Sequence, residues 1–233
     1  MALSLSQTVA LAAILKSGMR VASMGYPDII AQIPDMPGLK YRADSEQICR
    51  RHGLPLHRVP DAESWFALQE CKLDVYDVIK ERGCEIICDL NERLDPILRA
   101  WNYDVVLDVG TAEHCFNIAQ AMINMAGLVK MGGYIIHENP FNCGNHGFYN
   151  LNPTMFADFY AANGFKVLDC RLVSSAAEAR VPHTKRFRFT EQEVNTFCLA
   201  QRVEVKSFTF PVQSKYANLI PVAGVRADTK EAA

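Results

Sequence analysis

The sequence predicts an α/β protein with a doubly wound, mostly parallel β-sheet. Three observations indicate this fold. Apolar segments of strand length alternate with segments of helix length, several apolar segments end on glycine or aspartate, and 233 residues with 49% apolar content can bury one large core. Strands that alternate with helices form parallel sheets with right-handed crossovers.

The first third of the chain carries two glycine stops and two helix caps. An apolar helix ends at Gly18, and a short apolar strand ends at Gly25. Two further helices follow Asp44 and Asp61, whose carboxylates suit the N-cap position because they accept hydrogen bonds from the first turn. In order, we expect a helix over residues 5–16, a strand over 19–24, and helices over 45–52 and 62–70.

The middle of the chain carries three successive strands that end on an aspartate. These residues are Asp77, Asp89 and Asp108. An amphipathic helix comes next, and a turn at Gly132 and Gly133 separates it from another apolar strand. In order, we expect strands over residues 72–75, 85–88 and 104–107, a helix over 116–129, and a strand over 134–137.

The last third of the chain is expected to complete the sheet with antiparallel strands. A helix begins just after Asn152, and Gly164 stands just past its end, where left-handed backbone favours glycine. The last two strands lie near the C-terminus and can pair in antiparallel fashion. In order, we expect a helix over residues 153–163, a strand over 165–172, a helix over 191–199 and a strand over 203–212.

One long segment does not fit the alternation of strands and helices. Residues 34–62 are rich in proline and glycine, and they are longer than an ordinary crossover between strands. We interpret them as an inserted lid or substrate-binding element. The chain is therefore expected to form one domain over residues 1–227 with this insertion, followed by a disordered tail at 228–233.

Composition argues against several classes of partner. A net charge of −2 with scattered basic residues gives no signature for nucleic acid. Charged residues such as Lys16 and Arg20 interrupt the apolar N-terminus before the ~20 residues that cross a bilayer, so no membrane partner is expected. Eight cysteines without a CxxC pair, and no secretory signal, favour reduced thiols in a cytoplasmic protein. The sequence leaves open whether the protein forms a homo-oligomer.

The residues at the strand ends suggest a nucleoside ligand. A carboxylate at Asp77, Asp89 or Asp108 can accept two hydrogen bonds from a ribose diol or one from an adenine amino group, and Gly25 lets a ligand approach the backbone. The chain has no G-x-G-x-x-G or Walker sequence to hold phosphates, which favours a ligand without them. The alternative is that aspartate and glycine are simply common in loops.

The loops after the last parallel strands add a second group of polar side chains. Open parallel sheets place their ligands at the carboxyl ends of the strands. We therefore expect a common cleft to be faced by Asp108, Glu113, His114, His137, Glu138 and His146.

These segments resemble the class I S-adenosylmethionine-dependent methyltransferases over roughly residues 18–170. The sequence LVKMGGYII at 128–136 is similar to the Leu-x-Lys-Pro-Gly-Gly turn of that family, with Met131 in place of the proline. The closest likeness is to a bacterial branch with a Gly-Thr-x-Glu-His-x-Phe-Asn pattern, here GTAEHCFN at 110–117, a loop like NHGFY at 145–149, and the late segment FPVQSKY at 210–216. The usual glycine-rich first loop is reduced to GYPD at 25–28.

The resemblance implies S-adenosylmethionine as the cofactor and assigns parts of it to particular residues. By this likeness, Asp77 would hold the ribose hydroxyls, and Asp89 with Leu90 would border the adenine. Gly25 would let the methionine part pass, and Asp108 would lie near the transferred methyl group. The full set of implied cofactor residues is Gly25, Pro27, Asp77, Asp89, Leu90, Asp108 and Gly110.

Three residues are the catalytic candidates. His114 suits a general base, because the pKa of histidine lies near neutrality, and it could equally cap the helix that follows. Glu113 could orient His114, contact the cofactor, or serve the helix dipole, and His146 could form a wall for the substrate. No metal is expected, because the sequence contains no compact set of metal ligands.

The predicted activity is methyl transfer from S-adenosylmethionine to oxygen or nitrogen of a small polar, sugar-like or glycan-related acceptor. The reduced glycine loop leaves open an inactive protein of the same fold that binds a nucleoside or a partner. A nicotinamide-dependent oxidoreductase is the second alternative, although the chain has no glycine-rich pyrophosphate loop.

Overall fold

The structure is a computed structural model that describes residues 2–99, 102–174, 178–180 and 193–219. The helices are α1 (Leu5–Ile14), α2 (Ser45–Arg51), α3 (Ala62–Leu68), α4 (Pro96–Arg99), α5 (Ile118–Leu128) and α6 (Pro153–Ala162), with 3₁₀ turns η1 (Ala112–His114) and η2 (Ser214–Leu219). The strands are β1 (Ala2–Leu3), β2 (Arg20–Met24), β3 (Asp28–Ile29), β4 (Lys72–Asp77), β5 (Glu85–Ile87), β6 (Tyr103–Asp108), β7 (Val129–Pro140), β8 (Phe165–Val173), β9 (Glu178–Arg180) and β10 (Asn195–Arg202).

The main sheet contains eight strands in the order β5-β4-β2-β6-β7-β10-β8-β9. Neighbouring strands from β5 to β7 are parallel, whereas β10 is antiparallel to both β7 and β8. The chain runs outward from β2 to β4 and β5, then returns to β6 and β7 on the other side. This order confirms the predicted class I methyltransferase-like Rossmann fold with an antiparallel strand near the C-terminal end.

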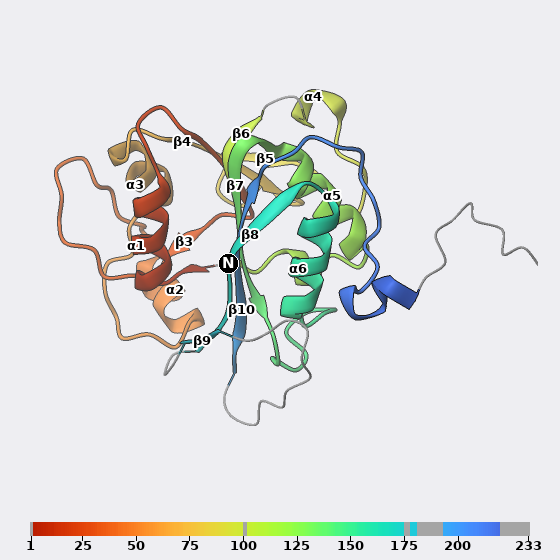
Figure 1. Cartoon of the computed structure of the whole chain (residues 1–233). Coiled ribbons are helices and arrows are strands. Elements are labelled where there is room, and N and C mark those ends of the chain that lie inside the picture. Colours follow the sequence, from red (N-terminus) through yellow and green to blue (C-terminus); the bar gives the residue numbers. More distant parts are fainter. Residues whose placement is uncertain (1, 100–101, 175–177, 181–192, 220–233) are drawn as a thin grey trace, which may run out of the picture.

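Helices cover both faces of the sheet, with α1 and α3 on one face and α5 and α6 on the other (Figure 1). The alternation of side chains along β6 shows how the two layers are built. Val105 packs in the apolar cluster that contains α1 and α3, and the next residue, Val106, packs in the cluster that contains α5 and α6. A strand buried on both faces therefore lies at the centre of the fold.

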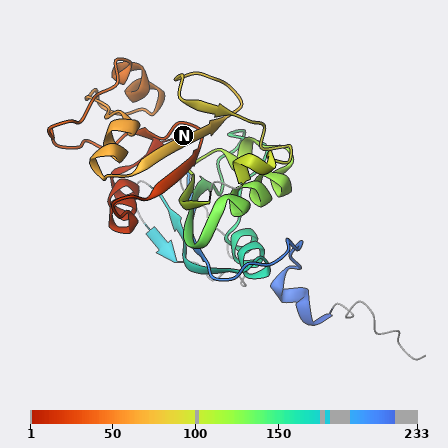
Figure 2. The same ribbon diagram turned by 90° about the horizontal axis from the view of Figure 1, so that it is seen from above.

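The segment at 34–62, interpreted above as an insertion, contains a small apolar cluster. Ile48 and Cys49 of α2 pack against Val59, and a single bridge joins Tyr41 to Pro60. Figure 2 shows this segment, in orange and brown, on the opposite side of the molecule from the blue turn η2. The insertion thus extends the edge of the fold near β3 and α3.

Two expected elements in the last third of the chain are wrong. The predicted helix over 191–199 is strand β10 over its described part, and the predicted strand over 203–212 is exposed chain without regular structure. β10 pairs on both sides and is buried at Thr196, Phe197 and Cys198, so it lacks the alternating pattern of a half-buried strand. Residues 228–233, expected to be disordered, lie outside the described residues.

The structure also differs from the expected glycine turn before the strand at 134–137 and from the expected helix cap at Asp44. Gly132 and Gly133 lie inside β7, which begins at Val129, rather than in a turn before it. A shift in register between β6 and β7 accompanies them. Asp61 caps α3 by accepting a hydrogen bond from the Ser64 amide at 2.9 Å, whereas Asp44 makes no side-chain cap bond and pairs with arginines instead.

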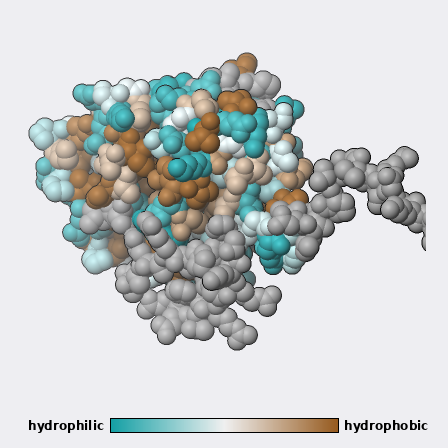
Figure 3. All heavy atoms as spheres, in the orientation of Figure 1, coloured by the Kyte–Doolittle hydropathy of each residue, from teal (hydrophilic) through white to brown (hydrophobic). Residues whose placement is uncertain are grey.

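The surface in the orientation of Figure 1 carries small hydrophobic patches interrupted by hydrophilic side chains (Figure 3). Among the residues that the structure describes, no helix is long and apolar enough to span a bilayer. The eight cysteines are free thiols.

Candidate functional site

A cavity of about 330 Å³ lies at the carboxyl ends of the parallel strands. Gly25 follows β2, Asp77 ends β4, and Gly110 follows β6, and all three line this cavity. The chain changes direction in the sheet between β2 and β6. Open α/β sheets bind their ligands at such a switch point, so we call this cavity the switch-point pocket.

The structure places most of the expected cofactor residues in the wall of the switch-point pocket. The lining includes Gly25, Asp77, Asp89, Leu90 and Gly110. Gly25 has a φ of 77°, a left-handed conformation that favours glycine and turns the chain away from β2. The other two expected residues, Pro27 and Asp108, are buried and do not belong to this lining.

Carboxylates outnumber basic groups in the pocket wall. Asp77 and Asp89 are joined there by Glu81, Glu85 and Asp28, whereas the basic residues are Arg51 and Arg82. Arg82 is itself paired with Asp28 at 3.4 Å. Such a wall favours a ligand with positive charge and disfavours one with several phosphates.

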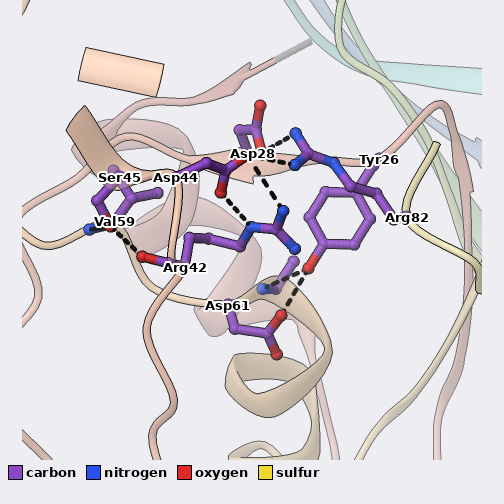
Figure 4. A network of polar contacts seen from close by, with 9 residues as sticks. Tyr26, Asp28, Arg42, Asp44, Ser45, Val59, Asp61 and Arg82 are labelled. Atoms are coloured by element: carbon purple, nitrogen blue, oxygen red, sulfur yellow. Dashed lines mark hydrogen bonds and ion pairs between the residues drawn. The ribbon is translucent and has the colours of Figure 1, made fainter. Parts of the chain in front are cut away.

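A network of polar contacts joins the pocket wall to the insertion (Figure 4). The Arg82 guanidinium lies 2.7 Å from Asp44, and Asp44 also pairs with Arg42 at 2.9 Å. Both guanidinium groups lie over the Tyr26 ring, and the Tyr26 hydroxyl donates to Asp61 at 2.9 Å. The insertion is thereby fixed to the loops after β2 and β4.

Asp108 lies beneath the pocket rather than in its wall. Its carboxylate accepts hydrogen bonds from the amides of Thr111 and Ala112, each at 3.0 Å, and so caps η1. The other carboxylate oxygen lies 2.7 Å from Nδ1 of His137, whose Nε2 contacts the Tyr160 hydroxyl. Burial by itself raises the pKa of Asp108, but the hydrogen bond with His137 holds that pKa below its ordinary value.

The three catalytic candidates converge beside the pocket, and His114 alone of the three belongs to its lining. Oε1 of Glu113 lies 3.4 Å from Nε2 of His146 and 3.9 Å from Nε2 of His114. The two imidazole rings lie 5.2 Å apart between centroids. Through His114, this group of residues, the Glu113–His114–His146 cluster, borders the switch-point pocket.

Burial and neighbouring charges shift the pKa values within the cluster. Burial, together with the negative charge of Asp108, raises the pKa of Glu113 to about 7. Burial and the nearby His146 lower the pKa of His114 below its ordinary value. A carboxyl group with a raised pKa and an imidazole with a lowered pKa thus lie side by side, an arrangement typical of functional sites.

The expectation that six polar residues face one cleft is wrong for Asp108, as described above, and for His137 and Glu138. Successive residues of a strand point to opposite faces. His137 therefore lies buried among α6 side chains, and Glu138 contacts Gln7 of α1 and Asn195 of β10 on the other face.

The sequence did not indicate the two arginines of the pocket wall. Arg51 comes from α2 in the insertion, and Arg82 comes from the loop after β4. Asn139 donates one hydrogen bond to Glu113 at 2.9 Å and one to Asp108 at 3.1 Å, linking the two carboxylates. The period of β7 could have placed Asn139 on the face of His137, because the two residues are two apart.

No protein-family model and no curated protein sequence matches the chain. Solved structures do match it. The N-methyltransferase NodS from Bradyrhizobium japonicum, in complex with S-adenosyl-L-homocysteine, is 11% identical, with a TM-score of 0.48 and coverage of 85% of either chain. The 16S rRNA (adenine(1408)-N(1))-methyltransferase from Catenulisporales acidiphilia is 12% identical, with a TM-score of 0.47, covering 86% of this chain and 94% of that one.

A third match is the 1,6-didemethyltoxoflavin-N1-methyltransferase from Burkholderia thailandensis. It is 14% identical, with a TM-score of 0.45, and the match covers 84% of this chain and 78% of that one. Likeness at this level says nothing about the reaction of this chain, which has to be argued from its own residues.

Proposed function

We propose that this protein is a methyltransferase that uses S-adenosylmethionine. The observation that carries the proposal is the pocket wall itself. Gly25, Asp77, Asp89 and Gly110 come from separate strand ends and surround one cavity in which carboxylates predominate. A nucleoside that carries a positively charged sulfonium and no phosphate suits such a wall.

Each part of the cofactor has a suitable neighbour in the wall. Asp77 ends β4 and accepts the two ribose hydroxyls, because an ionised carboxylate forms strong hydrogen bonds with a diol. Leu90, buried beside Asp89, packs against the adenine ring. Gly25 leaves room for the methionine part next to β2.

The acceptor binds at the end of the pocket formed by the Glu113–His114–His146 cluster. Methyl transfer mainly requires that the acceptor atom, the methyl carbon and the sulfur be held in line. His114 is half-exposed and lines the pocket, so it can contact an oxygen or nitrogen of a small polar or sugar-like acceptor. Arg51 places part of the insertion on the same pocket, which is consistent with a covering role for residues 34–62.

The nicotinamide alternative is disfavoured by the same wall. A dinucleotide carries a pyrophosphate, which would lie close to carboxylates such as Asp77 and Glu81. Dinucleotide sites instead offer a glycine-rich turn and a helix N-terminus to the phosphates. The first loop of this chain, after β2, leads into the two-residue strand β3 and offers no helix N-terminus.

Calorimetric titration with S-adenosylhomocysteine and with NAD⁺ tests the proposal. The parent protein should bind S-adenosylhomocysteine and not NAD⁺. Asp77→Ala should weaken that binding at least about tenfold, because each hydrogen bond to a charged group contributes roughly 1.5–3 kcal/mol. Asp158→Ala is the matched control, since Asp158 lies on α6 outside the pocket lining.

The outcomes separate the three candidate functions. Binding of NAD⁺ in preference to S-adenosylhomocysteine would contradict the proposal and favour an oxidoreductase. Binding of S-adenosylhomocysteine without turnover of S-adenosylmethionine, tested over a panel of hydroxylated and amine acceptors, would favour an inactive protein of the same fold. Equal affinities of the Asp77→Ala and Asp158→Ala variants would remove Asp77 from the site.

A further inference from the structure

Three potential metal ligands point at one another in the Glu113–His114–His146 cluster. Their ligand atoms, Oε1 of Glu113 and one ring nitrogen of each histidine, lie within 4.8 Å of one another. In a tetrahedral site with bonds of ~2.1 Å, ligand atoms lie roughly 3.4 Å apart. The separation between Glu113 and His146 is 3.4 Å, and that between Glu113 and His114 is 3.9 Å. The ring nitrogens of the two histidines lie within 4.8 Å of each other, so the half-exposed imidazoles have to rotate before all three separations reach this value.

The carboxylate oxygen at the centre of the cluster has no hydrogen-bond partner among the described residues. The Glu113 side chain is fully buried, and its Oε1 makes no hydrogen bond. An unpaired buried oxygen costs roughly 1–3 kcal/mol. The Nε2 atoms of His146 and His114 lie 3.4 and 3.9 Å from this oxygen, too far for good hydrogen bonds. The oxygen is therefore available as a metal ligand.

The position of His146 beside Glu113 is fixed by the backbone. The Phe148 amide donates to the carbonyl oxygen of Glu113 at 2.9 Å. A Cβ atom at Gly147 would lie only 2.8 Å from that same oxygen, so the loop approaches η1 as closely as glycine allows. This loop therefore presents His146 to Glu113 through backbone contacts rather than through side-chain packing alone.

The other carboxylate oxygen of Glu113, Oε2, accepts a hydrogen bond from Asn139. Asn139 donates to Oε2 of Glu113 at 2.9 Å and to Asp108 at 3.1 Å. Metal-binding carboxylates are usually oriented by such hydrogen bonds, which direct the remaining oxygen toward the ion. Asn139 thus aims Oε1 at the two imidazoles.

We propose that Glu113, His114 and His146 bind a divalent first-row transition-metal ion such as Zn²⁺. Two imidazoles and one carboxylate suit such ions, whereas Mg²⁺ prefers oxygen ligands. Both histidine side chains are about half-exposed, at 50% and 52%. The ion therefore keeps at least one open position beside the switch-point pocket, as in catalytic zinc sites with three protein ligands.

The ion would bind an acceptor oxygen or nitrogen at its open position and lower the pKa of a bound hydroxyl. This role rests on the proposed methyl transfer, whereas binding of the ion does not. The bound hydroxyl loses its proton to solvent, and the resulting alkoxide attacks the methyl carbon as the carbon–sulfur bond breaks. The products are then the methyl ether and S-adenosylhomocysteine.

Metal binding is tested on the full chain after removal of metals with a chelator. Zn²⁺ is titrated in competition with a chromophoric chelator, and Co²⁺ is added separately to record the visible spectrum. The parent should bind one equivalent of Zn²⁺, should give the intense visible bands of four-coordinate Co²⁺, and should not bind Mg²⁺.

Glu113→Gln and His146→Gln should each weaken Zn²⁺ binding at least about 100-fold, because loss even of a residue that only orients a metal ligand costs about 10–100-fold. His52→Gln is the matched control, since it removes an imidazole from the insertion and not from the cluster. Thermal unfolding without metal verifies that each variant is folded.

Absence of one-equivalent binding in the parent would overturn the metal site. Binding that survives both Glu113→Gln and His146→Gln would also overturn it, because the ion would then lie elsewhere, for example on the free thiols. Titration of the same samples with S-adenosylhomocysteine separates the two proposals. A protein that binds S-adenosylhomocysteine but not Zn²⁺ retains the proposed function without the metal.

Discussion

Replacing Arg82 by methionine should lower the free energy of unfolding by about 3 kcal/mol. The Arg82 side chain is 7% exposed and pairs with Asp28, which is 5% exposed, and with Asp44. Removing one partner of a buried ion pair typically costs roughly 3–5 kcal/mol, because the remaining charge stays buried. The loss falls on Asp28, which would keep a buried charge without this ion-pair partner, whereas Asp44 still pairs with Arg42. The contact of 3.4 Å between Arg82 and Asp28 is long, which favours the lower end of the range.

Urea unfolding followed by circular dichroism measures this loss. Arg50→Met is the matched control, because Arg50 pairs with Glu46 on the surface of α2 with both side chains largely exposed. Such a pair contributes less than about 1 kcal/mol. The double variant Arg82→Met, Asp28→Asn should recover more than half of the loss, because it removes the unpaired charge. Equal losses in Arg82→Met and Arg50→Met would refute the reasoning, as would a double variant no more stable than Arg82→Met alone.

Two further predictions concern the loop that carries His146 and the insertion. Gly147→Ala should destabilise the protein by about 1–3 kcal/mol, because the new Cβ would lie 2.8 Å from a backbone oxygen. Gly144→Ala is the control and should change the melting temperature little, because its Cβ would meet nothing within 4 Å. Similar melting temperatures for the two variants would mean that the loop moves freely. The hydrogen bond from Arg42, aided by Arg82, lowers the pKa of Asp44 to about 2, so this residue stabilises the fold above about pH 4 and loses that effect as the pH falls toward 2. Asp44→Asn should therefore lower the free energy of unfolding by about 1 kcal/mol at pH 7, after allowance for solvent screening. The difference in free energy of unfolding between the parent and Asp44→Asn should disappear as the pH is lowered. A difference that does not change with pH would contradict the assigned ion pairs.

Much of the pocket could be predicted because strand ends are visible in the sequence. Gly25, Asp77 and Asp89 follow short apolar segments, and a parallel sheet brings the carboxyl ends of neighbouring strands to one edge. Their meeting at one cavity follows from the topology alone. Asp108 also ends a strand, but its side chain does not line the pocket. Its carboxylate is instead hydrogen-bonded to two amides at the start of η1 and to the imidazole of His137.

The errors have physical causes of their own. β10 lies between two strands and is buried on both faces, so its sequence carries no alternating pattern. The segment at 203–212 does alternate apolar and polar residues, yet it lies exposed outside the sheet, and the open edge of β8 is taken by β9. The contribution of Arg51 depends on how the insertion folds back, and that of Arg82 on the path of the loop after β4, and no local sequence pattern encodes either.

The convergence of Glu113, His114 and His146 could be predicted only in part. Glu113 and His114 are adjacent in the chain, but the approach of His146 depends on backbone pairing between two loops. That pairing requires glycine at position 147, which a single sequence presents as an ordinary loop residue.

A crystal structure of the protein grown with S-adenosylhomocysteine tests the central claim most directly. Density for the ligand should fill the switch-point pocket, with both ribose hydroxyls within hydrogen-bonding distance of Asp77 and the adenine ring against Leu90. The sulfur should point toward the end of the pocket that carries His114. Density in any other cavity, or an empty switch-point pocket at saturating ligand, would contradict the proposal that this pocket holds the methyl donor.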